Sequence, residues 1–281
     1  MPHLHQTAHA PHLRYVVWEP ASSALPPRTV VLAHALGCDH TLWHDLAPAL
    51  ALGLVGGVLC GPCRVVAFDL RGHGVSDTAA GPCTMGDLAG DALRVIDAVS
   101  PDAPVVLLGV SLGGMLAQVV ALQRPERIQA LVLANTTSGY PADARRLWDE
   151  RVALARREGL ATLADAAMQR WFTPAFHERR PDAVARFRAL VAGQSPAGYA
   201  ACCEAIRDFD VAARLGAIRQ PTLVLGAEQD AGTPPAMARA LADGIPGAQL
   251  VVLGHAAHLA LVEQPDAFGA EVARFLAALP R

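Results

Sequence analysis

The hexapeptide Gly-Val-Ser-Leu-Gly-Gly at residues 109–114 constrains the fold of this chain more than any other segment. It follows the aliphatic run Val105–Leu108 and precedes the apolar run Met115–Gln123, which has a helical pattern. A Gly-x-Ser-x-Gly sequence between a strand and a helix is typical of a sharp turn that lifts a serine out of the end of a sheet. The glycines are needed because Cβ atoms would clash in so tight a turn. The segment therefore predicts a nucleophilic hydroxyl on Ser111.

Short aliphatic runs recur along the chain, with helical patterns such as Leu88–Val99 and Ala267–Leu279 between them. The expected strands are Arg14–Glu19, Val30–Ala33, Val65–Asp69, Val105–Leu108, Ala130–Ala134, Thr222–Leu225 and Gln249–Leu253. Nearly continuous apolar strands suit burial on both faces, and their alternation with helices predicts an α/β fold with a mostly parallel sheet.

The strand signal disappears between Ser138 and about Val211, where helix formers, arginines and aromatic residues dominate. Because strands resume afterwards, we expect residues 138–211 to form a helical cap over the sheet edge at which ligands usually bind. The expected organisation is a core of residues 1–137 and 212–281, interrupted by this cap.

A serine hydroxyl is a poor nucleophile until a base removes its proton, and that base needs a carboxylate to orient it. In this fold the acid and the histidine follow the serine in that order. Asp230 comes shortly after a predicted strand, and Glu228 is its rival in the same loop. The other position for an acid, after the strand that ends at Ala134, is occupied by the uncharged Asn135. Asp230 is therefore the preferred acid.

Two histidines, His255 and His258, follow the last predicted strand, and their positions alone do not decide which is the base. The oxyanion that forms on a substrate carbonyl needs N–H donors. We expect these donors to be the backbone amides of Leu112 and of Leu36, which lies in the loop after an early strand.

Composition excludes several other functions. The 23 basic residues are all arginine, against 26 acidic residues and a net charge of −3, which gives no general attraction to nucleic acid or anionic lipid. The absence of lysine excludes Schiff-base chemistry and a P-loop lysine. The longest apolar stretch, Ala49–Gly61, is too short to span a bilayer, and Met1–His12 does not resemble a secretory signal. We therefore expect a cytoplasmic protein.

The cysteines and clustered histidines predict no cofactor or metal. Cys60 and Cys63 form a single C-x-x-C pair, with no second pair at zinc-ligand spacing, so free thiols are expected. His34, His40 and His44 are spread over a loop and a helix start, a spacing that does not favour a metal site.

The chain resembles the α/β-hydrolase superfamily along its whole length. The matching blocks, in the expected order, are VVLAHALG, FDLRGHGVSD, GVSLGG, PTLVLGAEQD and HLALVEQP. Within that superfamily it is most similar to bacterial 3-oxoadipate enol-lactonases. The blocks that carry this similarity are HALGCDHTLW, RWFTPAF at Arg170–Phe176 and GYAACCEAI at Gly198–Ile206. It departs from the family pattern at Ala35, where that family usually has serine.

The resemblance implies an α/β-hydrolase fold with the cap inserted after the sixth strand. It implies Ser111 as nucleophile, Asp230 as acid and His258 as base. It also implies hydrolysis of 3-oxoadipate enol-lactone in the β-ketoadipate pathway of aromatic catabolism. A carboxylesterase or carbon-carbon bond hydrolase of the same fold is the alternative enzyme, and a ligand receptor with low turnover is the non-enzymatic one.

An enol-lactone of this kind carries a free carboxylate, which needs a cation if it is buried under a cap. Without lysine, that cation is an arginine or a protonated histidine. We expect Arg170, beside Trp171 in the cap block, to bind it, the alternative being that Arg170 is solvated and Trp171 merely packs. A small-molecule substrate is the only partner that the sequence predicts.

Overall fold

The computed structural model describes residues 3–20, 27–78 and 81–280. Within these residues, eight strands form one sheet in the order β1-β2-β6-β3-β7-β8-β9-β10. β1 pairs antiparallel with β2 and β2 with β6, and every later pair is parallel. The strands are β1 (Leu4–Gln6), β2 (Arg14–Trp18), β3 (Arg28–Ala33), β6 (Cys63–Phe68), β7 (Val105–Val110), β8 (Ile128–Ala134), β9 (Thr222–Ala227) and β10 (Gln249–Leu253). The predicted fold class is confirmed.

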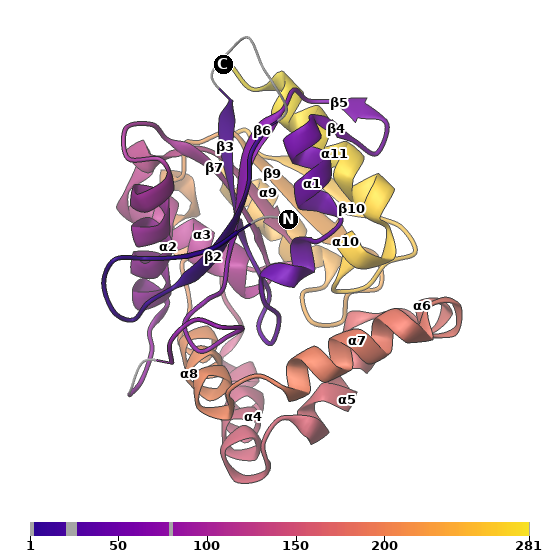
Figure 1. Ribbon diagram of the computed structural model, residues 1–281. Coiled ribbons are helices and arrows are strands. Elements are labelled where there is room, and N and C mark those ends of the chain that lie inside the picture. The colour runs from indigo at the N-terminus through magenta and orange to yellow at the C-terminus, as the bar shows by residue number, and fades with distance from the viewer. Residues whose placement is uncertain (1–2, 21–26, 79–80, 281) are drawn as a thin grey trace.

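Helices cover both faces of this sheet (Figure 1). The helices of the core are α1 (Leu46–Leu52), α2 (Met85–Val99), α3 (Leu112–Gln123), α9 (Pro235–Gly244), α10 (Ala260–Glu263) and α11 (Pro265–Ala278). Short 3-10 helices lie at His40–Trp43, Pro125–Arg127, Ala142–Ala144 and Ala212–Ala217. Strand side chains alternate between the faces, so that Val31 packs with α2 and α3 while Val30 packs with α1 and α11. Each face therefore has its own apolar core.

Two elements were not predicted. β1 is an edge strand whose three residues are all exposed, so it carries no hydrophobic pattern. The apolar stretch Ala49–Gly61 is not continuous, because α1 ends at Gly53, with φ of 79°, and a small hairpin of β4 (Leu54–Val55) and β5 (Val58–Leu59) follows. Gly56 and Gly57, both with positive φ, make its two-residue turn.

No helix in the described part of the chain is long and apolar enough to cross a membrane.

Between β8 and β9 the chain forms the helices of the proposed cap, residues 138–211. They are α4 (Arg145–Glu158), α5 (Ala161–Trp171), α6 (Pro174–Arg179), α7 (Pro181–Ala192) and α8 (Pro196–Arg207). In chain order β8 is the sixth strand of the large sheet, so these helices follow the sixth strand as expected. Figure 1 shows them gathered beyond one end of the sheet.

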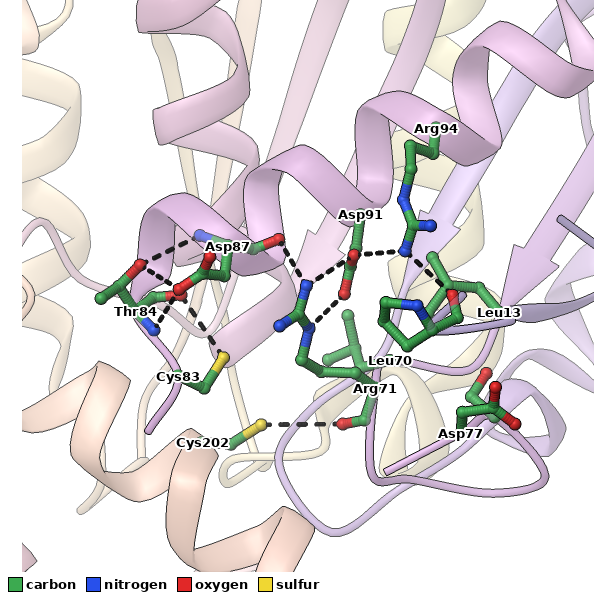
Figure 2. Close-up of polar contacts among 12 residues, drawn as sticks. Leu13, Leu70, Arg71, Asp77, Cys83, Thr84, Asp87, Asp91, Arg94 and Cys202 are labelled. Atoms are coloured by element: carbon green, nitrogen blue, oxygen red, sulfur yellow. Dashed lines mark hydrogen bonds and ion pairs between the residues drawn. The ribbon is translucent and has the colours of Figure 1, made fainter. Parts of the chain in front are cut away.

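Helix α8 is fixed to the core at the turn that follows β6 (Figure 2). The Cys202 thiol contacts the carbonyl oxygen of Arg71 at 4.0 Å, and the Arg71 guanidinium forms an ion pair with the buried Asp91 of α2 at 2.5 Å. The backbones of Gly72 and Gly198 approach so closely that a Cβ on Gly198 would lie 2.4 Å from the Gly72 oxygen. These contacts hold one side of the cap in place.

Candidate active site

Ser111 lies at the turn between β7 and α3, with φ of 55° and ψ of −115°. Positive φ is strained for a residue with a side chain, and such strain is often found at functional turns. Two glycines make the turn possible. A Cβ on Gly109 would lie 2.1 Å from the oxygen of Gly113, and a Cβ on Gly113 would lie 2.0 Å from the oxygen of Ala33. The sequence pattern at this turn is therefore imposed by backbone contacts.

The structure brings together the three side chains expected to act on a carbonyl. His258 Nε2 lies 2.9 Å from Ser111 Oγ. On the other side of the ring, His258 Nδ1 lies 2.9 Å from Asp230 Oδ2 and 3.0 Å from Oδ1. With Nδ1 protonated and donating to the carboxylate, Nε2 is left free to accept the serine proton. The three residues come from the loops after β7, β9 and β10, all at one edge of the parallel sheet.

Asp230 is buried and accepts several hydrogen bonds. The backbone amides of Gly232 and Thr233 donate to Oδ1 at 2.8 and 2.9 Å, and the Thr233 hydroxyl donates to Oδ2 at 2.7 Å. Burial opposes ionisation, but the charge and hydrogen bond of His258, with the bonds from Thr233, outweigh it and lower the pKa of Asp230 to about 2. Asp230 is therefore ionised at neutral pH and able to stabilise an imidazolium.

The alternative acid, Glu228, and the alternative base, His255, do not take part in this hydrogen-bonded row. Glu228 is exposed and accepts the backbone amide of His255 at 3.2 Å, and His255 is itself exposed. Asn135 donates its side-chain amide to Asp230 Oδ2 at 3.0 Å. The residue after β8 thus supports the carboxylate that follows β9. The sequence shows only that Asn135 lacks a charge, and neither this contact nor the contacts of Thr233 with Asp230 were predicted.

Leu36 and Leu112 are the residues expected to supply the oxyanion donors. Leu36 lies in the loop after β3 and lines the same cavity as Ser111, and Leu112 directly follows Ser111 in the chain. Leu112 is the first residue of α3, where an amide has no acceptor within the helix. Neither amide has a hydrogen-bond acceptor among residues 3–20, 27–78 and 81–280. Both are available for a substrate oxygen.

A cavity of about 340 Å³ opens above Ser111 and His258 and is covered by the cap. This volume suits a small molecule. The apolar part of its lining includes Leu36, Met115, Trp148, Trp171, Tyr199 and Met237. Trp171, which was expected beside Arg170 at the substrate, lines this cavity, and its carbonyl oxygen accepts the amide of Leu259, next to His258, at 3.1 Å.

Two arginines of the cap, Arg151 on α4 and Arg170 on α5, also line the cavity. Arg151 lies over the Trp148 ring, 4.4 Å from its centroid. Burial, and then repulsion from Arg151, lowers the pKa of Arg170. Within the described parts of the chain, neither guanidinium has a carboxylate partner. Arg151 was not predicted, because only the fold separates it from the other arginines of the cap.

Those other arginines differ in their contacts. Several are paired with acidic residues at the surface: Arg146 with Glu150, Arg156 with Glu204, Arg180 with Asp182 and Arg207 with Asp149. Arg151 and Arg170 differ from these paired arginines because they line the cavity.

The remaining candidate ligands for a metal are the clustered histidines and the cysteines. His34 and His40 are hydrogen-bonded to Ala35 and Asp69. The six cysteines are buried. Among the described residues, no three histidine, cysteine or acidic side chains are grouped so that they could hold a metal ion.

Both the sequence and the fold of this chain are similar to those of known proteins. The model of the α/β-hydrolase fold family matches residues 28–265. A 3-oxoadipate enol-lactonase of Acinetobacter baylyi is 38% identical over 205 residues, 73% of this chain and 75% of that protein. A putative carbamate hydrolase of Variovorax paradoxus is 34% identical and covers 94% of this chain and 96% of its own. The crystal structure of the enol-lactonase from Burkholderia xenovorans is 33% identical, with a TM-score of 0.86 over 94% of this chain and 96% of that chain.

Proposed function

Because the chain belongs to the α/β-hydrolase family and is an ester hydrolase, we propose that it opens 3-oxoadipate enol-lactone to 3-oxoadipate, a step of aromatic catabolism in the β-ketoadipate pathway. One observation carries this proposal. The hydrogen-bonded row of Ser111, His258 and Asp230 lies under a small cavity that contains two unpaired guanidinium groups. A reactive ester and a separate carboxylate, the two parts of this substrate, each have a partner there.

In the first half of the reaction, Ser111 Oγ attacks the lactone carbonyl while its proton moves to His258 Nε2. The amides of Leu36 and Leu112 donate to the oxyanion, and Asp230 stabilises the imidazolium. The ring C–O bond then breaks, and the enol oxygen leaves with the proton from His258. An enol is a better leaving group than an alkoxide, so this step needs little acid assistance.

The second half restores the enzyme. Water attacks the acyl group on Ser111, with His258 as general base, and the tetrahedral intermediate again lies at the two amides. Its collapse breaks the bond to Ser111 Oγ, which recovers its proton from His258. The released enol becomes a ketone by tautomerisation, so the product is a keto acid with two carboxylates.

The substrate carboxylate is proposed to bind Arg170 and Arg151. Burial of a cation without a counter-ion is costly in free energy. A carboxylate in the cavity therefore offsets the cost of desolvating Arg170 and its repulsion from Arg151. A planar guanidinium can bind a carboxylate through two parallel hydrogen bonds. The relative from Acinetobacter baylyi, named as an enol-lactonase, supports this choice of substrate. The proposed location is the cytoplasm, where cysteine thiols are kept reduced.

The test compares kcat/KM for three substrates: the enol-lactone, the neutral ester p-nitrophenyl acetate and a small carbamate. The carbamate is included because the putative carbamate hydrolase covers more of the chain than the lactonase relative. We expect the lactone to have the highest kcat/KM. A higher value for the ester or for the carbamate would contradict the lactone assignment, and turnover of none of the three would favour a ligand receptor.

Variants of the two arginines test carboxylate binding. Arg170→Ala and Arg151→Ala are each expected to lower kcat/KM for the lactone about 10- to 100-fold, the range for a hydrogen bond to a charged group, and to leave the neutral ester nearly unchanged. Arg156→Ala is the matched control, because Arg156 is a cap arginine paired at the surface with Glu204. Equal effects on lactone and ester would remove the arginines from the substrate site.

A further inference from the structure

His34 is a fully buried histidine directly after β3, and the proposed reaction does not use it. Its Nδ1 lies 2.8 Å from the carbonyl oxygen of Ala35, and its Nε2 accepts the backbone amide of Leu70 at 3.0 Å. An amide N–H can only donate, so Nε2 must be unprotonated. Nδ1 then carries the proton and donates to Ala35. The two contacts together select one neutral tautomer of the ring.

The environment of His34 keeps it in that neutral form. Burial lowers the pKa of His34 and outweighs the carboxylates of Asp69 and Asp39, which act in the opposite direction. His40 adds to the lowering, and the ring of His73, itself buried, lies 5.4 Å away. Protonation at Nε2 would remove the acceptor of the Leu70 amide. The neutral ring is thus both the favoured form and the form that satisfies its neighbours.

The carbonyl of Ala35 belongs to the same peptide unit as the amide of Leu36. Besides His34, this oxygen accepts the amide of Cys38 at 3.0 Å. The Ala35–Leu36 peptide is trans, so its C=O and N–H bonds point in opposite directions in one plane. Two donors that fix the oxygen on one side therefore fix the direction of the Leu36 N–H on the other.

We propose that His34 is a positioning residue, which aims the Leu36 amide at the substrate oxyanion by holding the carbonyl of Ala35. This inference rests on the proposed serine hydrolysis but not on the choice of lactone. The polar turn after β6 takes part in this positioning, because its Leu70 amide donates to His34 Nε2. Asp69 fixes the turn by accepting the amides of His40 and Val75 at 2.7 and 3.0 Å.

Two variants separate the contacts of the ring. The side-chain amide of Asn can occupy the place of Nδ1 and donate to Ala35, whereas the longer Gln reaches the place of Nε2 and leaves Ala35 without this donor. We expect His34→Gln to lower kcat for p-nitrophenyl acetate about 10- to 100-fold with little change in KM, since loss of a whole oxyanion donor costs about 100- to 1000-fold. His34→Asn is expected to recover most of that loss.

The matched control is His73→Asn, at the neighbouring buried histidine, which contacts the carbonyl of Arg71 and not that of Ala35. Its kcat should remain near that of the wild type. A second readout is the inhibition constant of a boronic acid, which forms a tetrahedral adduct on serine. We expect His34→Gln to weaken this inhibitor by the same factor as kcat, while thermal unfolding shows the variant to be folded.

The outcomes are distinct. If the wild type hydrolyses esters and folded His34→Gln has the same kcat and inhibition constant, the inference is wrong and the proposed function is untouched. Equal loss in His34→Asn and His34→Gln would also overturn it, because the donor to Ala35 would then be irrelevant. If the wild type hydrolyses neither ester nor lactone, the proposed function fails and this inference fails with it.

Discussion

Asn135 donates its side-chain amide to Asp230 Oδ2 over 3.0 Å, and through this bond the end of β8 supports the carboxylate that follows β9. Asn135 has φ of 46°, a left-handed conformation that asparagine tolerates better than most residues. Its side chain is buried with Asp230 and also lies 3.4 Å from the carbonyl oxygen of Ala257, next to His258. The amide thus joins both loops that carry the proposed acid and base.

Asn135→Gly tests this support. Glycine accepts the positive φ without strain, so the variant removes the hydrogen bond and leaves the backbone conformation possible. We expect kcat/KM for a neutral ester to fall about 10-fold, the cost of one hydrogen bond to a charged group. Kinetics equal to those of the wild type would show that Asp230 does not need this donor.

His258 and His255 should differ strongly in their effects. His258→Ala removes the base and is expected to lower kcat by several orders of magnitude, as large as the effect of Ser111→Ala, because residues that act as a unit fail together. His255→Ala changes an exposed side chain and should have a mild effect. The reverse ranking in steady-state assays would move the base to His255.

Asp230→Asn should change the pH dependence of stability as well as slow turnover. The pKa of Asp230 is lowered in the folded protein to about 2, so its ionised form stabilises the fold above its ordinary pKa of 3.8, and this contribution is lost as the pH falls through about 2. We expect the variant to be about 2 kcal/mol less stable near pH 7, with the difference shrinking in acid. Urea unfolding between pH 7 and pH 3 measures it, and a difference that grows in acid would contradict this sign. Glu228→Gln is the control for turnover.

Two Gly→Ala changes test the packing at the serine turn. Gly113→Ala would place a Cβ 2.0 Å from the oxygen of Ala33 and is expected to cost about 3 kcal/mol or more. Gly90→Ala is the control, because no atom lies within 4 Å of its Cβ position inside α2, and it should stabilise the protein by about 1 kcal/mol. Chemical denaturation that gives equal values for the two variants would show that α3 and β3 do not approach each other so closely at Gly113.

The parts of the fold predicted from sequence are those specified locally. Strands such as Val105–Val110 and Thr222–Ala227 carry continuous aliphatic runs, and the glycines around Ser111 mark a turn whose close backbone contacts leave no room for a Cβ. The hairpin Leu54–Leu59 was not predicted because its leucines and valines have no two-residue period, and because glycines alone mark its turn.

The contacts that support the site depend on the fold and escaped prediction. Asn135 and Asp230 are 95 residues apart, and nothing in the sequence shows that they meet. Arg151 belongs to a series of cap arginines whose partners are set by the packing of α4. Ser111 and Asp230 could be predicted because each follows a strand of a parallel sheet, and such strands end at the same edge. The choice of His258 over His255 came from the family resemblance, because both histidines follow the same strand.

The measurement that tests the account most directly is the turnover of 3-oxoadipate enol-lactone by the wild type and by Ser111→Ala. The account predicts efficient opening of the lactone by the wild type and a loss on the order of 10⁴-fold or more in the variant, with thermal unfolding unchanged. A folded Ser111→Ala protein that keeps most of the lactonase activity would contradict it, as would a wild type that does not open the lactone.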